Sequence, residues 1–137
     1  MSPRKIKTAR EDKVKAALYL KKAGDNHKAM LQAYESSNFN AAATLAVQCA
    51  ISAADAVCVH ESGVRSLSPN HMDVCELVNT VPLPESREKS ITLKRIIAKK
   101  NLIQYESRSI YKKEADDIVK YADRFYKWSL SVTGAGS

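Results

Sequence analysis

The stretch FNAAATLAVQCAISAADAVCVH, residues 39–60, decides the fold of this 137-residue chain. Its apolar residues recur at steps of three and four, as on one face of an α-helix, and alanine dominates among them. Few charges fall on any face of such a helix. Because small side chains let neighbouring helices approach closely, the stretch predicts the central helix of a helical bundle.

Periodic apolar residues predict further helices on both sides of this stretch. They cover residues 10–36, 71–80, 87–105 and 111–131. Turns rich in Ser, Asn, Gly and Pro separate these segments, and almost no strand signal precedes the second turn region. Helices joined by short connections pack against one another with alternating direction, so we expect an all-α fold, an antiparallel up-down bundle of four to five helices.

Length and composition indicate one globular domain. Hydrophobic residues make up 45% of the chain and charged residues 27%, which suits one core that needs no disulfide or structural metal. We expect a single domain over residues 1–137, with frayed ends at 1–9 and 133–137. We find no run of about 18 apolar residues that would cross a bilayer and no secretory signal, and we expect a cytoplasmic protein without a membrane partner.

The cysteines and histidines form neither a disulfide framework nor a metal-binding motif. They are Cys49, Cys58, Cys75, His27, His60 and His71. An odd number of cysteines at wide spacings is typical of reduced, mostly buried thiols. No CxxC, HxxxH or HExxH spacing occurs, so we expect no metal and no cofactor.

Two residues of the first predicted helix need an explanation. Gly24 costs about 1 kcal/mol relative to alanine inside a helix, so either the helix bends there or close packing requires a missing side chain. His27 falls on the apolar stripe. This position predicts a packed histidine with a backbone or water partner rather than a catalytic group.

The charge is unevenly distributed along the chain. Residues 1–28 hold nine Lys and Arg against three Asp and Glu, residues 29–84 hold one against five, and residues 85–137 hold twelve against seven. Clustered cations attract phosphates through counterion release, so the two basic ends permit a nucleic-acid or an acidic protein partner. Lysine-rich helices are also commonly solvated faces without a ligand.

Most familiar catalytic motifs are absent, including a Gly-rich phosphate loop and GxSxG. The order of several short segments is more informative. These are AGD at 23–25, the turn at 34–41, AVQCAI at 46–51, NHMDVCELV at 70–78, KKNLIQY at 99–105, EA at 114–115 and ADRF at 122–125. In this order and spacing the chain resembles the HEPN domain, the higher eukaryotes and prokaryotes nucleotide-binding domain.

The resemblance implies a compact helical bundle that forms homodimers and takes part in toxin–antitoxin, phage-defence or RNA-processing systems, often beside a partner nucleotidyltransferase. Catalytic HEPN members cleave RNA with an arginine and a histidine four to six residues apart, near the start of the last long helices. Here Arg95 is followed at those distances by Lys99, Lys100 and Asn101, and no histidine follows His71. An asparagine cannot transfer a proton near neutral pH as imidazole does, which puts RNA cleavage by the family's mechanism in doubt.

Arg65 and His71 satisfy the spacing at a different place, in the loop before the third predicted helix. In a catalytic interpretation His71 is the general acid or base and Arg65 clamps a phosphate across a dimer groove. In a structural interpretation the ring of His71 bonds nearby backbone, and Arg65 pairs with Asp55, Glu61 or Asp73.

The fourth predicted helix supplies the best candidates for contact with phosphate. Spacings of one, four and five place its cations on one side of the helix, and the candidates are Lys94, Arg95, Lys99, Lys100 and Asn101. A solvated face explains the same residues. Tyr105 lies near the position at which the nucleotidyltransferase modifies a tyrosine in some toxin members, and a core or interface tyrosine is the alternative.

Three hypotheses follow. The first is a non-catalytic HEPN-like homodimer that binds RNA or nucleotide phosphates, or docks a partner enzyme. The second is a divergent metal-independent endoribonuclease that uses Arg65 and His71. The third is a structural module that serves only dimerisation.

Overall fold

The computed structural model describes residues 6–135 and contains five α-helices in that range. They are α1 (Ala16–Glu35), α2 (Phe39–Ser62), α3 (Met72–Asn79), α4 (Ser86–Tyr105) and α5 (Lys112–Thr133). A short 3-10 helix, η1 (Lys13–Lys15), precedes α1. The predicted all-α bundle is confirmed, and each helix lies within a few residues of its expected range except the first, whose α-helical part begins at Ala16 rather than residue 10.

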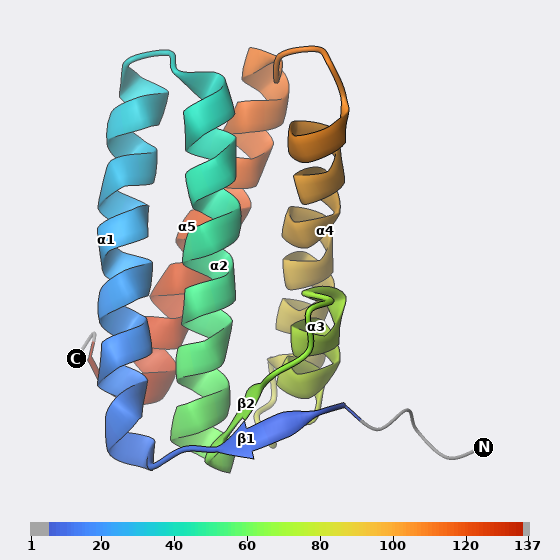
Figure 1. Ribbon diagram of the computed structural model, residues 1–137. Helices are drawn as coiled ribbons and strands as arrows, with labels where there is room; N and C mark the ends of the chain where they lie inside the picture. The colour runs from blue at the N-terminus through green and yellow to red at the C-terminus, as the bar shows by residue number, and fades with distance from the viewer. Residues whose placement is uncertain (1–5, 136–137) are drawn as a thin grey trace.

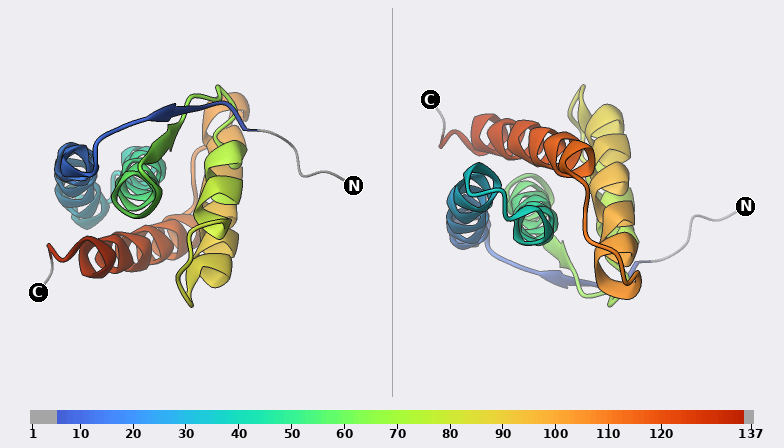
Figure 2. Two further views of the ribbon diagram at one scale, coloured as in Figure 1. Left: turned by 90° about the horizontal axis from the view of Figure 1, so that it is seen from below. Right: turned by 90° about the horizontal axis from the view of Figure 1, so that it is seen from above.

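The helices surround α2 (Figures 1 and 2). α1 packs along one side of α2, α4 lies on the other, and α5 crosses behind and contacts α1, α2 and α4. α3 is short and covers the lower part of α4. Residues along three sides of α2 are therefore buried, among them Ala46, Cys58 and Val59, as the alanine-rich stretch predicted.

α2 is long and apolar enough to cross a membrane by length and composition, so the expectation that no such run exists is wrong. Within its most apolar 18-residue window, 67% is buried inside the bundle. Its apolar surface therefore forms the protein core. The helix ends at Gly63, which adopts a left-handed conformation with φ of 65° and donates its N–H to the Val59 carbonyl at 3.0 Å.

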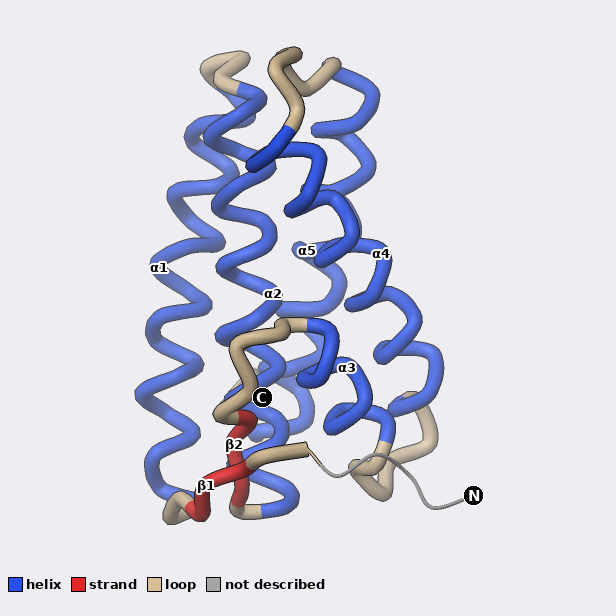
Figure 3. Tube along the Cα trace, turned by 45° about the vertical axis from the view of Figure 1, so that its right-hand side comes forward, coloured by secondary structure: helices blue, strands red, loops and turns tan. Residues whose placement is uncertain are grey.

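A small antiparallel sheet was not expected from the sequence. β1 (Thr8–Arg10) pairs with β2 (Val64–Ser66) at the base of the bundle (Figure 3). Residues 8 and 9, which were predicted to fray, are thus paired with β2. Thr133, also predicted to fray, is the last residue of α5. Positions 1–5, 136 and 137 of the predicted frayed ends lie outside the described residues. Strands of three residues are too short to show the alternation by which strands are recognised, and this pairing joins segments more than fifty residues apart.

Gly24 permits close packing between α1 and α5. A Cβ atom at this position would lie 2.9 Å from the hydroxyl of Tyr126, closer than side chains normally approach. His27, one turn further along, stacks on the Tyr126 ring with centroids 4.5 Å apart. Its Nε2 bonds the Asp123 carboxylate at 2.7 Å, so a carboxylate takes the place of the backbone or water partner that was predicted.

The three cysteines are free and buried, as expected. Burial raises the pKa of Cys49 and of Cys58 to about 12 and that of Cys75 to about 11. These thiols therefore stay protonated at neutral pH and pack as small apolar side chains.

Candidate functional site

A polar cleft lies between α1 and α2. It has a volume of about 420 Å³ and is lined from α1 by Tyr19, Lys22, Asp25 and Asn26, from α2 by Gln48, Ile51, Ser52 and Asp55, and from β2 by Arg65. We call it the α1–α2 cleft. Among the described residues, the side chains of Asn26, Gln48 and Ser52 make no hydrogen bond, so their polar groups are available to a ligand.

A second hollow of about 490 Å³ adjoins the first. Tyr19, Lys22, Asp25 and Arg65 line both. The second hollow adds Glu11, Lys15, Leu18 and Lys21 to its walls, and we call it the lysine hollow. The two together form one continuous site. The amides and Asp55 lie in the cleft, Lys15, Lys21 and Glu11 lie in the lysine hollow, and Lys22, Asp25 and Arg65 border both.

Arg65 lies at the boundary of the two hollows. Its Nη1 donates to the Tyr19 hydroxyl at 3.3 Å, and its guanidinium carbon lies 5.3 Å from the centre of the Tyr19 ring. The Tyr19 hydroxyl in turn donates to Glu11 Oε1 at 2.7 Å, and burial together with this bond raises the pKa of Tyr19. Glu11 Oε2 and Arg65 Nε are buried without a hydrogen-bond partner in the described part of the chain.

Asp55 is a half-buried carboxyl group in the wall of the cleft. Among residues 6–135 it has no hydrogen-bond or ion-pair partner. Burial raises the pKa of Asp55 to about 6. The positive charges of Arg65 and Lys22 lower this pKa, and the negative charge of Glu11 raises it. Most buried polar groups in proteins are hydrogen-bonded, so an unbonded carboxyl group such as Asp55 needs an explanation. Carboxyl groups with a shifted pKa in a cleft are typical of functional sites.

The structure does not bring Arg65 and His71 into one cluster. Arg65 contacts Tyr19, whereas His71, at the start of α3, lies in the field of Lys100 from α4. Burial first, and Lys100 second, lower the pKa of His71. Arg65 is attracted to Asp55 without a hydrogen bond, and the ring of His71 does not cap its helix.

The basic residues of α4 point to different sides of the helix, so the expectation that they line one side is wrong. Arg95 and Lys99 line a hollow of about 350 Å³ against α5, together with Asp117. Lys100 lines a separate hollow of about 270 Å³ against α2. Adjacent positions lie 100° apart around a helix, and here Lys99 faces the hollow against α5 while Lys100 faces the hollow against α2. Lys94 lies toward Cys75 of α3, and Asn101 is exposed.

Tyr105 is the last residue of α4, and 75% of its surface is exposed. It belongs neither to the core nor to a contact between helices. An external enzyme can therefore reach its hydroxyl group.

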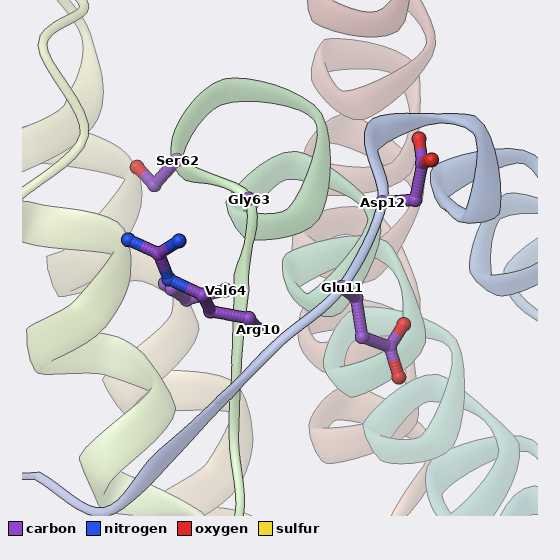
Figure 4. A pocket seen from close by; sticks show the side chains of 6 residues that line it. All are labelled: Arg10, Glu11, Asp12, Ser62, Gly63 and Val64. Atoms are coloured by element: carbon purple, nitrogen blue, oxygen red, sulfur yellow. The ribbon is translucent and has the colours of Figure 1, made fainter.

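A wider hollow of about 520 Å³ lies at the end of the two strands, bordered by Arg10, Glu11, Asp12 and Ser62 (Figure 4). The carboxylates of Glu11 and Asp12 lie on the opposite side of the strand from the side chains of Arg10 and Ser62. Because these groups do not converge, the hollow does not form a site comparable with the cleft.

The fold and the cleft define a helical-bundle domain with a polar cleft between its first two long helices. The family model of the HEPN domain matches residues 16–132, and the chain therefore belongs to the HEPN family. HEPN domains are helical modules linked to nucleotides and RNA, and they commonly dimerise and act on RNA. A comparison with curated proteins gave no match.

Proposed function

We propose that the chain is a non-catalytic RNA- or nucleotide-binding HEPN module that holds phosphate groups in the lysine hollow. The observation that carries the proposal is the placement of Lys15, Lys21, Lys22 and Arg65 around one hollow of about 490 Å³. Lysines and arginines carry positive charge and donate hydrogen bonds, and phosphate oxygens accept these bonds.

The acidic residues of the hollow leave room for an anion. Glu11 accepts a hydrogen bond from Tyr19, and Asp25 pairs with Lys21 at 3.4 Å on the surface. Exposed pairs of this kind contribute little energy, so a phosphate can replace Asp25 beside Lys21. Lys22 has no carboxylate within ion-pair distance in the described residues.

Fluorescence anisotropy with labelled single-stranded RNA across a salt series tests the proposal. Loss of one phosphate contact lowers the slope of log affinity against log salt by about 0.7 for single strands. We expect Lys22→Ala to lower both slope and affinity, and Lys28→Ala, an exposed lysine of the same helix outside both hollows, to change neither. Equal behaviour of the two variants would contradict the proposal.

A metal-independent ribonuclease that uses Arg65 and His71 is the second candidate, because an imidazole side chain can transfer protons near neutral pH, and burial beside Lys100 lowers the pKa of His71. This candidate predicts cleavage of RNA in the presence of chelator, lost in His71→Ala while the helical circular dichroism spectrum persists. Intact RNA with both proteins supports the non-catalytic proposal.

The same proposal places the module in the cytoplasm as a homodimer within a toxin–antitoxin or defence-type system.

We propose a nucleotidyltransferase as the partner enzyme that modifies the module, with the Tyr105 hydroxyl as the acceptor. The 75% exposure of Tyr105 supports this role. Mass spectrometry after incubation with the enzyme encoded by a neighbouring gene should show one nucleotidyl adduct, absent in Tyr105→Phe, and light scattering should show a dimer.

A further inference from the structure

Asp55 is a carboxyl group without a hydrogen-bond donor in the wall of the α1–α2 cleft, among the described residues. Its carboxyl group is half-buried, yet among the described residues nothing donates a hydrogen bond to it. The charged groups that face it are Arg65 from β2, Glu11 from the segment after β1 and Lys22 from α1, and on its own helix Cys58 is neutral. A carboxylate held this way is suited to a ligand that offers N–H donors.

The walls of the cleft narrow the choice of ligand. A volume of about 420 Å³ admits a planar heterocycle, and Asn26 and Gln48 carry amides that both donate and accept. The adjoining lysine hollow binds anions under the proposed function. A molecule with a polar planar end and an anionic end, as in a nucleotide, matches both halves of the site.

The chemistry of the bases distinguishes among nucleotides. The two oxygens of a carboxylate accept two parallel hydrogen bonds. Guanine alone among the four RNA bases presents two adjacent donors on its Watson–Crick edge, N1–H and the 2-amino group. Adenine and cytosine place a ring acceptor beside their amino group, which repels a carboxylate, and uracil presents one donor between two acceptors.

We propose that the α1–α2 cleft binds the guanine base of a nucleotide or of an RNA end, and that Asp55 selects it by accepting hydrogen bonds from N1–H and the 2-amino group. This inference rests on the proposed function, since the phosphates lie in the lysine hollow. Asn26 and Gln48 line the same cleft, and their amides can both donate to and accept from a base.

Isothermal titration of the full chain with GMP, IMP and AMP tests the inference. IMP lacks only the 2-amino group and AMP lacks both donors. We expect GMP to bind tightest, IMP several-fold weaker, and AMP at least about tenfold weaker than GMP, the usual effect of one bidentate contact to a base. Asp55→Asn should remove this preference, whereas Asp117→Asn, a carboxylate between α4 and α5, should preserve it.

Each outcome separates the inference from the proposed function. Lys15→Ala, which removes a cation of the lysine hollow outside the α1–α2 cleft, should weaken all three nucleotides by the same factor and keep their order. Equal binding of the three by the unmodified chain, with Lys15→Ala still weakened, overturns the guanine inference alone. Absence of nucleotide binding at millimolar concentration overturns the guanine inference, whereas absence of salt-dependent RNA binding overturns the proposed function. Equal competition by spermidine, an amine without a base, also overturns the inference, because a general amine site would then explain Asp55. Circular dichroism melts establish that each variant is folded.

Discussion

His27 Nε2 lies 2.7 Å from Asp123 Oδ1, and this contact joins α1 to α5 across 96 positions of sequence. An ionised carboxylate only accepts hydrogen bonds, so Nε2 carries the proton. Lys127 also bonds Asp123 at 2.9 Å. Burial raises the pKa of Asp123, but the bonds from His27 and Lys127 outweigh burial, and the net shift is downward.

His27→Ala should therefore destabilise the bundle. A hydrogen bond to a charged group contributes about 1.5–3 kcal/mol, and stacking on Tyr126 adds to it. We expect urea unfolding at pH 7 to show a loss of stability in this range, whereas Lys28→Ala on the same helix should unfold at nearly the same urea concentration as the unmodified chain.

The effect of His27→Ala should also depend on pH. Because folding lowers the pKa of Asp123, its carboxylate stabilises the fold at pH values above its ordinary pKa of 3.8 and loses this effect as the pH falls. The difference between His27→Ala and the parent should therefore shrink below about pH 4. A difference that grows in acid would contradict this account.

Gly24 and Tyr126 should be energetically coupled. Alanine is favoured over glycine inside a helix by about 1 kcal/mol, but the added Cβ would meet the Tyr126 hydroxyl at 2.9 Å. In Tyr126→Phe that oxygen is absent, and the next atom of the ring lies 3.8 Å away, an ordinary contact. We expect Gly24→Ala to gain about 1 kcal/mol only in the Tyr126→Phe background. A double-mutant cycle by chemical denaturation measures this coupling, and an equal effect in both backgrounds would show that the close approach is unimportant.

The helices could be predicted from the sequence because their signals are local. Residues 39–60 combine helical periodicity with small side chains, and they form the buried centre of the bundle as α2. The β1–β2 pairing could not be predicted in the same way. Thr8 and Ser66 are adjacent only after α1 and α2 have folded back on each other, so no pattern within either segment announces the sheet.

The candidate site was harder to predict for the same reason. Glu11, Tyr19, Asp55 and Arg65 come from four parts of the chain, and only Arg65 was a candidate from the sequence. One local signal was available, since Asp55 is the single acidic residue in the alanine-rich stretch of residues 39–60. The α4 lysines were misplaced because neighbours in sequence were assumed to share a face, whereas Lys99 and Lys100 face different helices.

Arg65→Ala should change the titration of Asp55. Arg65 and Lys22 both favour the ionised carboxylate, while burial and Glu11 oppose it. Without the guanidinium the pKa of Asp55 should rise above its present value of about 6. Carboxyl-carbon NMR titration of ¹³C-labelled protein measures the change, with Arg95→Ala as a control whose charge lies beside α5. An unchanged Asp55 titration would show that Arg65 does not act on this carboxyl group.

Asp55→Asn should stabilise the fold while removing the proposed base preference. The pKa of Asp55 rises from 3.8 to about 6 on folding, so the ionised form is disfavoured in the folded protein. At 1.36 kcal/mol for each pH unit, the cost at neutral pH is about 3 kcal/mol. The folded state binds the proton more tightly, so the cost is absent below about pH 4, grows between pH 4 and 6 and is complete above pH 6.

The gain in unfolding free energy on Asp55→Asn should depend on pH in the same way as the cost of the ionised carboxylate. We expect a gain of about 1–3 kcal/mol at pH 7.5, allowing for loss of the attraction to Arg65 and Lys22, and little gain at pH 4. Asp117→Asn, whose carboxylate pairs with Lys113 at 3.0 Å on the surface, should show no such gain. Thermal and urea unfolding at both pH values measure the profile. A loss of stability at pH 7.5 would show that the ionised carboxylate is a structural partner of Arg65. A gain would show instead that the chain retains a destabilising carboxyl group in its cleft, as binding sites do when a ligand supplies the missing hydrogen bonds.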